Sequence, residues 1–130
     1  MTDKEALQRN KESAKRFYTM AFNEGKPQEA VDKYIGDHYT QHHTQAGDGK
    51  ENFIAFCEQV KDTYPEMHVR IHRVIAEDDK VVLHSQEIIP DEEEYASMHI
   101  FGFDGDGQII EHWDVMQEIP DSMPHDNGMF

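Results

Sequence analysis

Residues 99–116 read HIFGFDGDGQIIEHWDVM, and this stretch predicts the last hairpin of an antiparallel sheet. Two runs rich in Ile, Phe, Val and Trp flank Asp104-Gly105-Asp106-Gly107, a composition typical of a hairpin turn. Side chains alternate between the two faces of a strand, so the second run has two distinct faces. These are His112, Asp114 and Met116 on one side, and Ile109, Glu111, Trp113 and Val115 on the other.

The segments before this hairpin predict helices first and strands later. Apolar residues at helical spacing indicate helices over about 3–25, begun by Asp3, then 27–36 and 50–64, with an irregular polar stretch at 37–50. After Pro65 the spacing alternates, which predicts strands at 67–76, 80–89, 95–103 and 108–117 and an extended tail over 118–130. This order indicates one α+β domain, residues 1–130, with helices packed on a curved antiparallel sheet as a cone with one open mouth.

Composition and charge narrow the function classes. The chain has 130 residues, and its 27 acidic against 12 basic residues give a net charge of −15. Nucleic acids and anionic membranes bind clustered Lys and Arg, so neither is expected as a partner. The single Cys57 allows no internal disulfide and no cysteine-based zinc site. The polar start, without a signal-peptide pattern, makes the cytoplasm the expected compartment.

The hairpin also predicts a chemical site, because folding it back brings His99 level with Asp114. A carboxylate in the middle of a strand beside Trp113 and Val115 is costly to bury without a partner. We expect a partly buried Asp114 to have a raised pKa, suited to general acid/base catalysis. A structural His–Asp hydrogen bond, or a strand with a hydrated polar face, would explain the same residues.

The remaining histidines give weaker predictions. His42 and His43 are adjacent, so in a strand they would point to opposite faces, and a solvated loop is the expected setting for both. Histidines on neighbouring strands could instead make a metal site with Asp114, built from His84, His99 and His112. Cross-strand polar pairs are the simpler interpretation, and no metal or other cofactor is expected.

Several short motifs resemble the SnoaL-like branch of the nuclear-transport-factor-two-like superfamily along essentially the whole chain. They are Phe17-Tyr18, Tyr34-Ile35, Tyr39-Thr40-Gln41, Asp48-Gly49-Lys50-Glu51, Ile110-Glu111-His112-Trp113-Asp114-Val115 and Asn127-Gly128-Met129-Phe130. More narrowly, the chain resembles small bacterial proteins described as SnoaL-like aldol-condensation-catalysing enzymes. The resemblance implies a cone-shaped α+β barrel, commonly a homodimer packed through the sheet.

The resemblance also implies a reaction, namely cofactor-free acid/base catalysis such as an intramolecular aldol condensation, a cyclisation or an isomerisation of a carbonyl compound. Asp114 corresponds to the acid/base carboxylate of the polyketide cyclases, and His99 to their assisting histidine. The residues expected to contact a hydrophobic or aromatic substrate are Gln41, His112, Trp113, His84 and Tyr18. Two alternatives stay open: a binding module without catalysis on the same fold, and the metal-dependent site described above.

Overall fold

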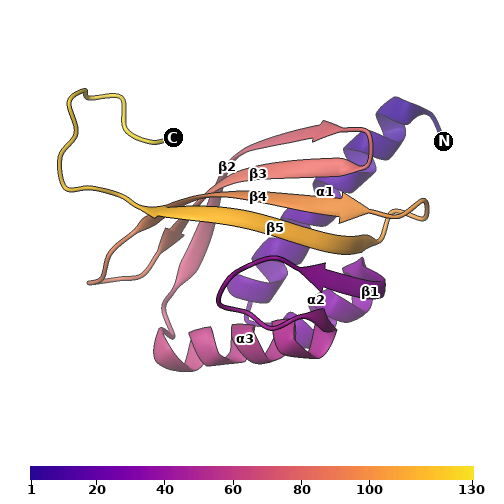
Figure 1. Ribbon diagram of the computed structural model, residues 1–130, viewed down its shortest axis with the longest axis horizontal. Helices are drawn as coiled ribbons and strands as arrows, with labels where there is room; N and C mark the ends of the chain where they lie inside the picture. The colour runs from indigo at the N-terminus through magenta and orange to yellow at the C-terminus, as the bar shows by residue number, and fades with distance from the viewer.

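A computed structural model describes residues 1–130 and has three helices packed on one five-stranded sheet (Figure 1). The elements are α1 (Asp3–Phe22), α2 (Pro27–Tyr34), β1 (Ile35–Gln41), α3 (Gly49–Thr63), β2 (His68–Glu77), β3 (Lys80–Ile88), β4 (Tyr95–Phe103) and β5 (Ile109–Glu118). The predicted α+β class is therefore confirmed. None of the helices combines the length and the apolar character that crossing a membrane requires.

The first helix begins one residue earlier than the sequence suggested. Thr2, rather than Asp3, is the N-cap, because its hydroxyl accepts a hydrogen bond from the backbone N–H of Glu5 at 3.1 Å. The Glu5 side chain in turn faces the backbone N–H of Thr2, which completes a capping box. The buried side of α1 includes Phe17 and Tyr18, and both contribute to the core.

The segment predicted as an irregular polar stretch contains a strand instead. Helix α2 ends at Tyr34, and residues 35–41 form β1, which pairs in parallel with β5. The sheet order is β1-β5-β4-β3-β2, so the sheet is mixed and not wholly antiparallel. Only Ile35 and Tyr39 of β1 are buried, which explains why apolar alternation did not reveal this edge strand.

One extra residue in β5 changes which side chains face the core. Phe103 pairs with Ile109, but the next residue of β4, Gly102, pairs with Glu111. Ile110 is therefore a bulge, and Ile109 lies on the same face as His112 instead of the opposite one. The predicted grouping of His112 with Asp114 is correct, whereas the placement of Ile109 with Glu111 and Trp113 was wrong.

The core lies between the helices and the inner face of the sheet. Phe17 stacks on Phe53 with ring centroids 5.1 Å apart and meets the edge of Phe101 at 5.9 Å. Along β3 the buried inner-face residues change from Val81 and Leu83 to Ser85 and Glu87. The inner face of the sheet is thus apolar at one end and polar at the other, and the polar end positions the site.

Candidate functional site

A cavity of about 950 Å³ opens between the helices and the polar end of the inner sheet face. Its wall is mostly hydrophobic and includes aromatic side chains from α1, α3 and β4, such as Phe17, Phe53 and Phe101. Its polar residues include Tyr18, Gln41, His43, Glu87, His99, His112 and Asp114. A large apolar cavity with a few converging polar groups is the usual form of a small-molecule site.

Asp114 lies on the inner face of β5 and is held by His43. Nδ1 of His43 lies 2.8 Å from each carboxylate oxygen of Asp114, and the two side chains are only 13% and 6% exposed. His43 follows β1, and the parallel pairing of Gln41 with His112 brings it over the site. The expectation of a solvated His43 was therefore wrong. Nε2 of His43 has no partner within the protein.

The pKa of Asp114 lies below the ordinary aspartate value, which contradicts the predicted rise. Burial does favour a higher pKa, and it is the largest single effect. The hydrogen bond from His43 and the electrostatic effect of the nearby imidazole rings of His112, His99 and His43 act together in the opposite direction and outweigh it. Asp114 is therefore ionised at neutral pH, as a general base must be, and not held protonated as a general acid.

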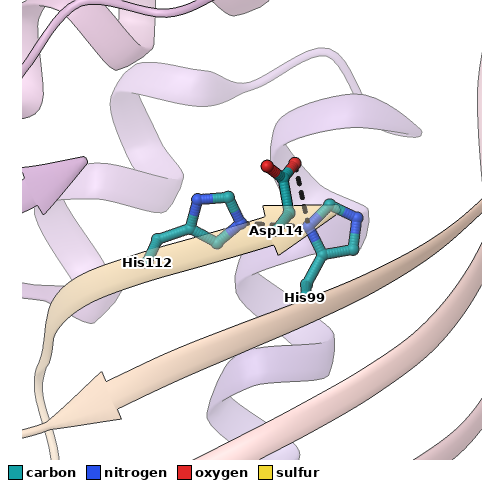
Figure 2. Close-up of side chains that lie close together, drawn as sticks. All are labelled: His99, His112 and Asp114. Atoms are coloured by element: carbon teal, nitrogen blue, oxygen red, sulfur yellow. Dashed lines mark hydrogen bonds and ion pairs between the residues drawn. The ribbon is translucent and has the colours of Figure 1, made fainter. Parts of the chain in front are cut away.

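His99 stands opposite Asp114 across the hairpin, as the sequence predicted. Figure 2 shows His99, His112 and Asp114 pointing toward one another from β4 and β5. The nearest approach of His99 to Asp114 is 3.7 Å, between Nδ1 and Oδ2, which is an ion-pair distance rather than a hydrogen bond. The hydrogen bonds of the His99 ring go instead to His112, at 3.0 Å, to Glu87, also at 3.0 Å, and to the hydroxyl of Ser97, at 3.1 Å.

Glu87 is a buried carboxylate on the inner face of β3, with three hydrogen-bond donors around a single oxygen. Its Oε1 lies 2.6 Å from the hydroxyl of Tyr18, 2.7 Å from that of Ser97 and 3.0 Å from Nε2 of His99. Burial alone would raise the pKa of Glu87. The hydrogen bond and charge of His99, together with the hydrogen bonds from the two hydroxyl groups, outweigh burial and lower this pKa. Burial, followed by the charge of the nearby Glu87 carboxylate, raises the pKa of Tyr18, which therefore stays a neutral donor.

Gln41 and His112 form the other wall of the polar cluster. Oε1 of Gln41 lies 2.7 Å from Nδ1 of His112. Burial, followed by the charge of His99, lowers the pKa of His112 to about 3. His112 is therefore neutral at physiological pH, and its role as a partner in the site is one of hydrogen bonding and not of charge.

A family model described as the SnoaL-like domain matches residues 14–112 of the chain. The chain belongs to the SnoaL-like family. The matched residues run from α1 to His112 and include the strands β1 to β4 with their site residues. No match was found among curated proteins.

Solved structures share the fold of this SnoaL-like chain. A candidate polyketide cyclase from Bacillus cereus ATCC 10987 superimposes with a TM-score of 0.75 and 21% identity, over 89% of this chain and 78% of that one. A candidate ketosteroid isomerase from Kribbella flavida gives 0.72 at 12% identity, over 92% and 85%. AclR, a candidate hydroxylase from Streptomyces galilaeus, gives 0.67 at 15%, over 85% and 79%. Such identities show a common fold that carries differently named activities.

Two residues expected to contact the substrate do not line the cavity of the SnoaL-like fold. His84 lies on the outer face of β3, where it meets Arg73 and the ring of Phe130. Trp113 lies on the outer face of β5, stacked on His42 with ring centroids 5.0 Å apart. Strand alternation explains both positions, because their neighbours Leu83 and His112 are the buried ones. The expectation for these two side chains was wrong, whereas Tyr18, Gln41 and His112 do line the cavity.

The predicted metal constellation is only partly assembled. Donor atoms of His99, His112 and Asp114 lie within 4.8 Å of one another, whereas His84 lies on the other face of the sheet. Two imidazoles and a carboxylate are a donor set that zinc or ferrous iron accepts. The metal-dependent alternative, reduced to these three residues, stays a prediction.

Sequence reasoning missed Glu87 and His43. A signal for Glu87 was available, because it continues the alternation Val81, Leu83, Ser85 at the inward positions of its strand. No comparable signal existed for His43, whose position depends on the parallel pairing of β1 with β5, and which lies 71 residues from Asp114 in sequence. Only the hairpin of β4 and β5 is marked by a local pattern, whereas the contributions of β1 and β3 depend on pairing between distant segments.

Proposed function

We propose that this SnoaL-like protein is an enzyme that acts on a small carbonyl compound by acid/base catalysis without a cofactor. The reaction class is an intramolecular aldol condensation or cyclisation, or a related isomerisation. The observation that carries the proposal is the ionised Asp114, oriented by His43, in the wall of an apolar cavity of about 950 Å³. The neighbours named as cyclase and isomerase agree with this class of chemistry.

The geometry supports a short proton-transfer sequence. Asp114 removes a proton from the carbon between two carbonyl groups of the substrate, and the C–H bonding electrons form an enolate. The enolate carbon attacks a second carbonyl of the same molecule, which forms a C–C bond and leaves an alkoxide. A proton returned to the alkoxide completes the aldol. The aromatic cavity wall holds both reacting ends together, which converts the attack into a well-oriented intramolecular step.

A deuterium-exchange assay tests the first step without knowledge of the natural substrate. The probe is benzoylacetone, an aromatic 1,3-diketone, incubated with the protein in D₂O while NMR follows its methylene protons. We expect exchange above the protein-free rate, and we expect Asp114→Asn to reduce the catalysed rate by about a hundred- to ten-thousand-fold. Full exchange activity in the Asp114→Asn protein would remove Asp114 from the mechanism.

Glu111→Gln is the matched control for this experiment. Glu111 is another carboxylate of β5, but it faces away from the cavity and pairs with His42 at 2.8 Å. The same carboxylate-to-amide change at this position should leave the exchange rate within about twofold. A comparable loss in both variants would indicate a general effect on the fold instead of a catalytic one.

A binding module without catalysis is the second candidate, and the mostly hydrophobic wall of the cavity favours it. It would hold the same class of ligand, a small hydrophobic or aromatic molecule. Asp114→Asn distinguishes the two candidates, because a binding module would retain affinity for the probe while neither protein catalyses exchange. Isothermal titration of both proteins with benzoylacetone provides that comparison.

We also propose a homodimer that forms through the outer face of the sheet. Large apolar side chains are exposed on this face, with Met98 at 44%, Ile100 at 36% and Ile75 at 57%. A second copy of the same face would cover them in a symmetric contact. Analytical ultracentrifugation gives the mass in solution, and a monomer at micromolar concentration would contradict the proposal.

A further inference from the structure

Four side chains of the site form one continuous row of hydrogen bonds along the inner face of the sheet. The row runs from Gln41 through His112 and His99 to Glu87. Its three links are 2.7 Å, 3.0 Å and 3.0 Å long. Each link needs one proton between its two heavy atoms, so the row can be analysed for which atom holds each proton.

The orientation of the Gln41 amide fixes one end of the row. Its Oε1 accepts hydrogen bonds from the backbone N–H groups of His42, at 3.1 Å, and His43, at 3.0 Å. A rotated amide would point its NH₂ group at these two donors, which is unfavourable. The atom facing His112 is therefore an oxygen that can only accept.

The proton assignments then follow along the row. Nδ1 of His112 must donate to Gln41. One proton lies between the rings of His112 and His99, and His99 holds it because this ring lies 3.0 Å from the carboxylate of Glu87. His112 contacts only the neutral amide of Gln41 at its other nitrogen, so its Nε2 accepts. Nδ1 of His99 must accordingly donate to His112. Nε2 of His99 faces a carboxylate oxygen of Glu87 at 3.0 Å and the hydroxyl oxygen of Ser97 at 3.1 Å. Because the Ser97 hydroxyl donates its proton to Glu87 at 2.7 Å, both oxygens accept from the ring. Both nitrogens of the His99 ring are thus required to be donors.

We infer that His99 is a doubly protonated imidazolium in the folded protein, and that Glu87 is the positioning residue that keeps its second proton in place. The titratable groups facing the ring come from three elements. Tyr18 of α1 and Glu87 of β3 lie on one side, and His112 and Asp114 of β5 lie on the other. One positive ring between two carboxylates leaves the cluster with a single net negative charge.

A charged His99 would supply the proton donor of the proposed reaction, and this part of the inference rests on the proposed function. While Asp114 takes a proton from carbon, the adjacent imidazolium stabilises the negative charge that develops on the enolate oxygen. His99 then donates a proton to the product alkoxide, and the proton on Asp114 returns to His99 across the 3.7 Å that separates Oδ2 from Nδ1. Protons balance over the cycle, and no further reactant is needed.

NMR of the ligand-free protein tests the protonation state directly. The protein is labelled with ¹⁵N-histidine, and the His99 signals are assigned by their absence in His99→Gln. In the wild type at pH 7 we expect imidazolium-type ¹⁵N shifts and an attached proton on both ring nitrogens of His99. A single protonated nitrogen on His99 would overturn the inference. Stoichiometric zinc or iron by mass spectrometry would also overturn it, because a metal ion would take the place of the proton between the two rings.

Two variants examine the role of Glu87. Glu87→Gln keeps the shape of the side chain and an oxygen that accepts from Tyr18 and Ser97, but it removes the negative charge beside His99, so the ring should lose one of its two protons at pH 7. Ser97→Ala removes one hydroxyl that contacts both the same oxygen and Nε2 of His99, but it leaves the charge of Glu87 in place, so both protons on His99 should remain. In the exchange assay, Glu87→Gln should lower kcat at least tenfold with KM within about threefold. Because the NMR needs no substrate, it can succeed even where the exchange assay finds no catalysis.

Discussion

Acid should weaken the folded state through His112, because this buried ring is neutral when folded and can take up a proton only when the chain unfolds. Its pKa is lowered to about 3, against an ordinary value of about 6.5 for an exposed histidine. The unfolded state therefore binds one more proton between these two values. The stabilisation is fully present above pH 6.5 and is lost as the pH falls, by about 1.4 kcal/mol per pH unit. Between pH 7 and pH 5 the loss amounts to about 2 kcal/mol.

The assay compares urea unfolding of the wild type and His112→Asn at pH 7 and pH 5. Asparagine can still donate to Gln41, but it has no titration of its own in this range. The fluorescence of Trp113, the single tryptophan, reports unfolding. Other titrating groups contribute to both proteins, so the difference between their unfolding free energies isolates His112. The wild type should lose about 2 kcal/mol relative to the variant, and a difference that stays constant with pH would refute the neutral state of His112.

Four further outcomes follow from the same structure. His43→Asn removes a donor that lowers the pKa of Asp114, so the acid limb of the exchange rate should move to higher pH; an unchanged profile would argue against the contact. His84→Ala lies outside the cavity and should leave the affinity for benzoylacetone within about twofold by titration calorimetry. Ile100→Glu places a charge in the exposed apolar face and should give a monomer in the ultracentrifuge if the wild type is a dimer. Phe101→Ala, at a side chain only 1% exposed, should cost about 3 to 5 kcal/mol in urea unfolding, and a loss below 1 kcal/mol would contradict its core position.

The last hairpin was predictable because its information is local. Its turn residues and alternation were sufficient to place His99 level with Asp114, and that pairing is confirmed. The helices were predictable for the same reason, since the spacing of residues such as Phe17 and Phe53 marks a buried side. Local patterns of this kind arise from the period of a single element.

The electrostatics of the site were not predictable because they depend on contacts between distant segments. A raised pKa for Asp114 follows from burial alone, and the opposite direction results from His43, which β1 brings in from 71 residues away. Similarly, strand alternation places His84 on one of the two faces of the sheet, but only the packing of the helices decides which face is the inner one. A prediction from burial alone, without the hydrogen-bond partners, therefore gives the wrong direction for the pKa shift of Asp114.

The bulge at Ile110 makes the site depend on the register of the chain as well as on its side chains. Deleting Ile110 would restore strict alternation and still leave Ile109, His112 and Asp114 on the inner face, whereas the same residues paired without a bulge would turn either Ile109 or the pair His112 and Asp114 away from the cavity. A substitution at Asp114 removes a single group, whereas a loss of the bulge with all residues kept would exchange the whole set of groups that face the ligand. For a fold that hosts many activities, the gain or loss of a bulge at this point is thus a route by which one strand can present either of two chemistries to the same cavity.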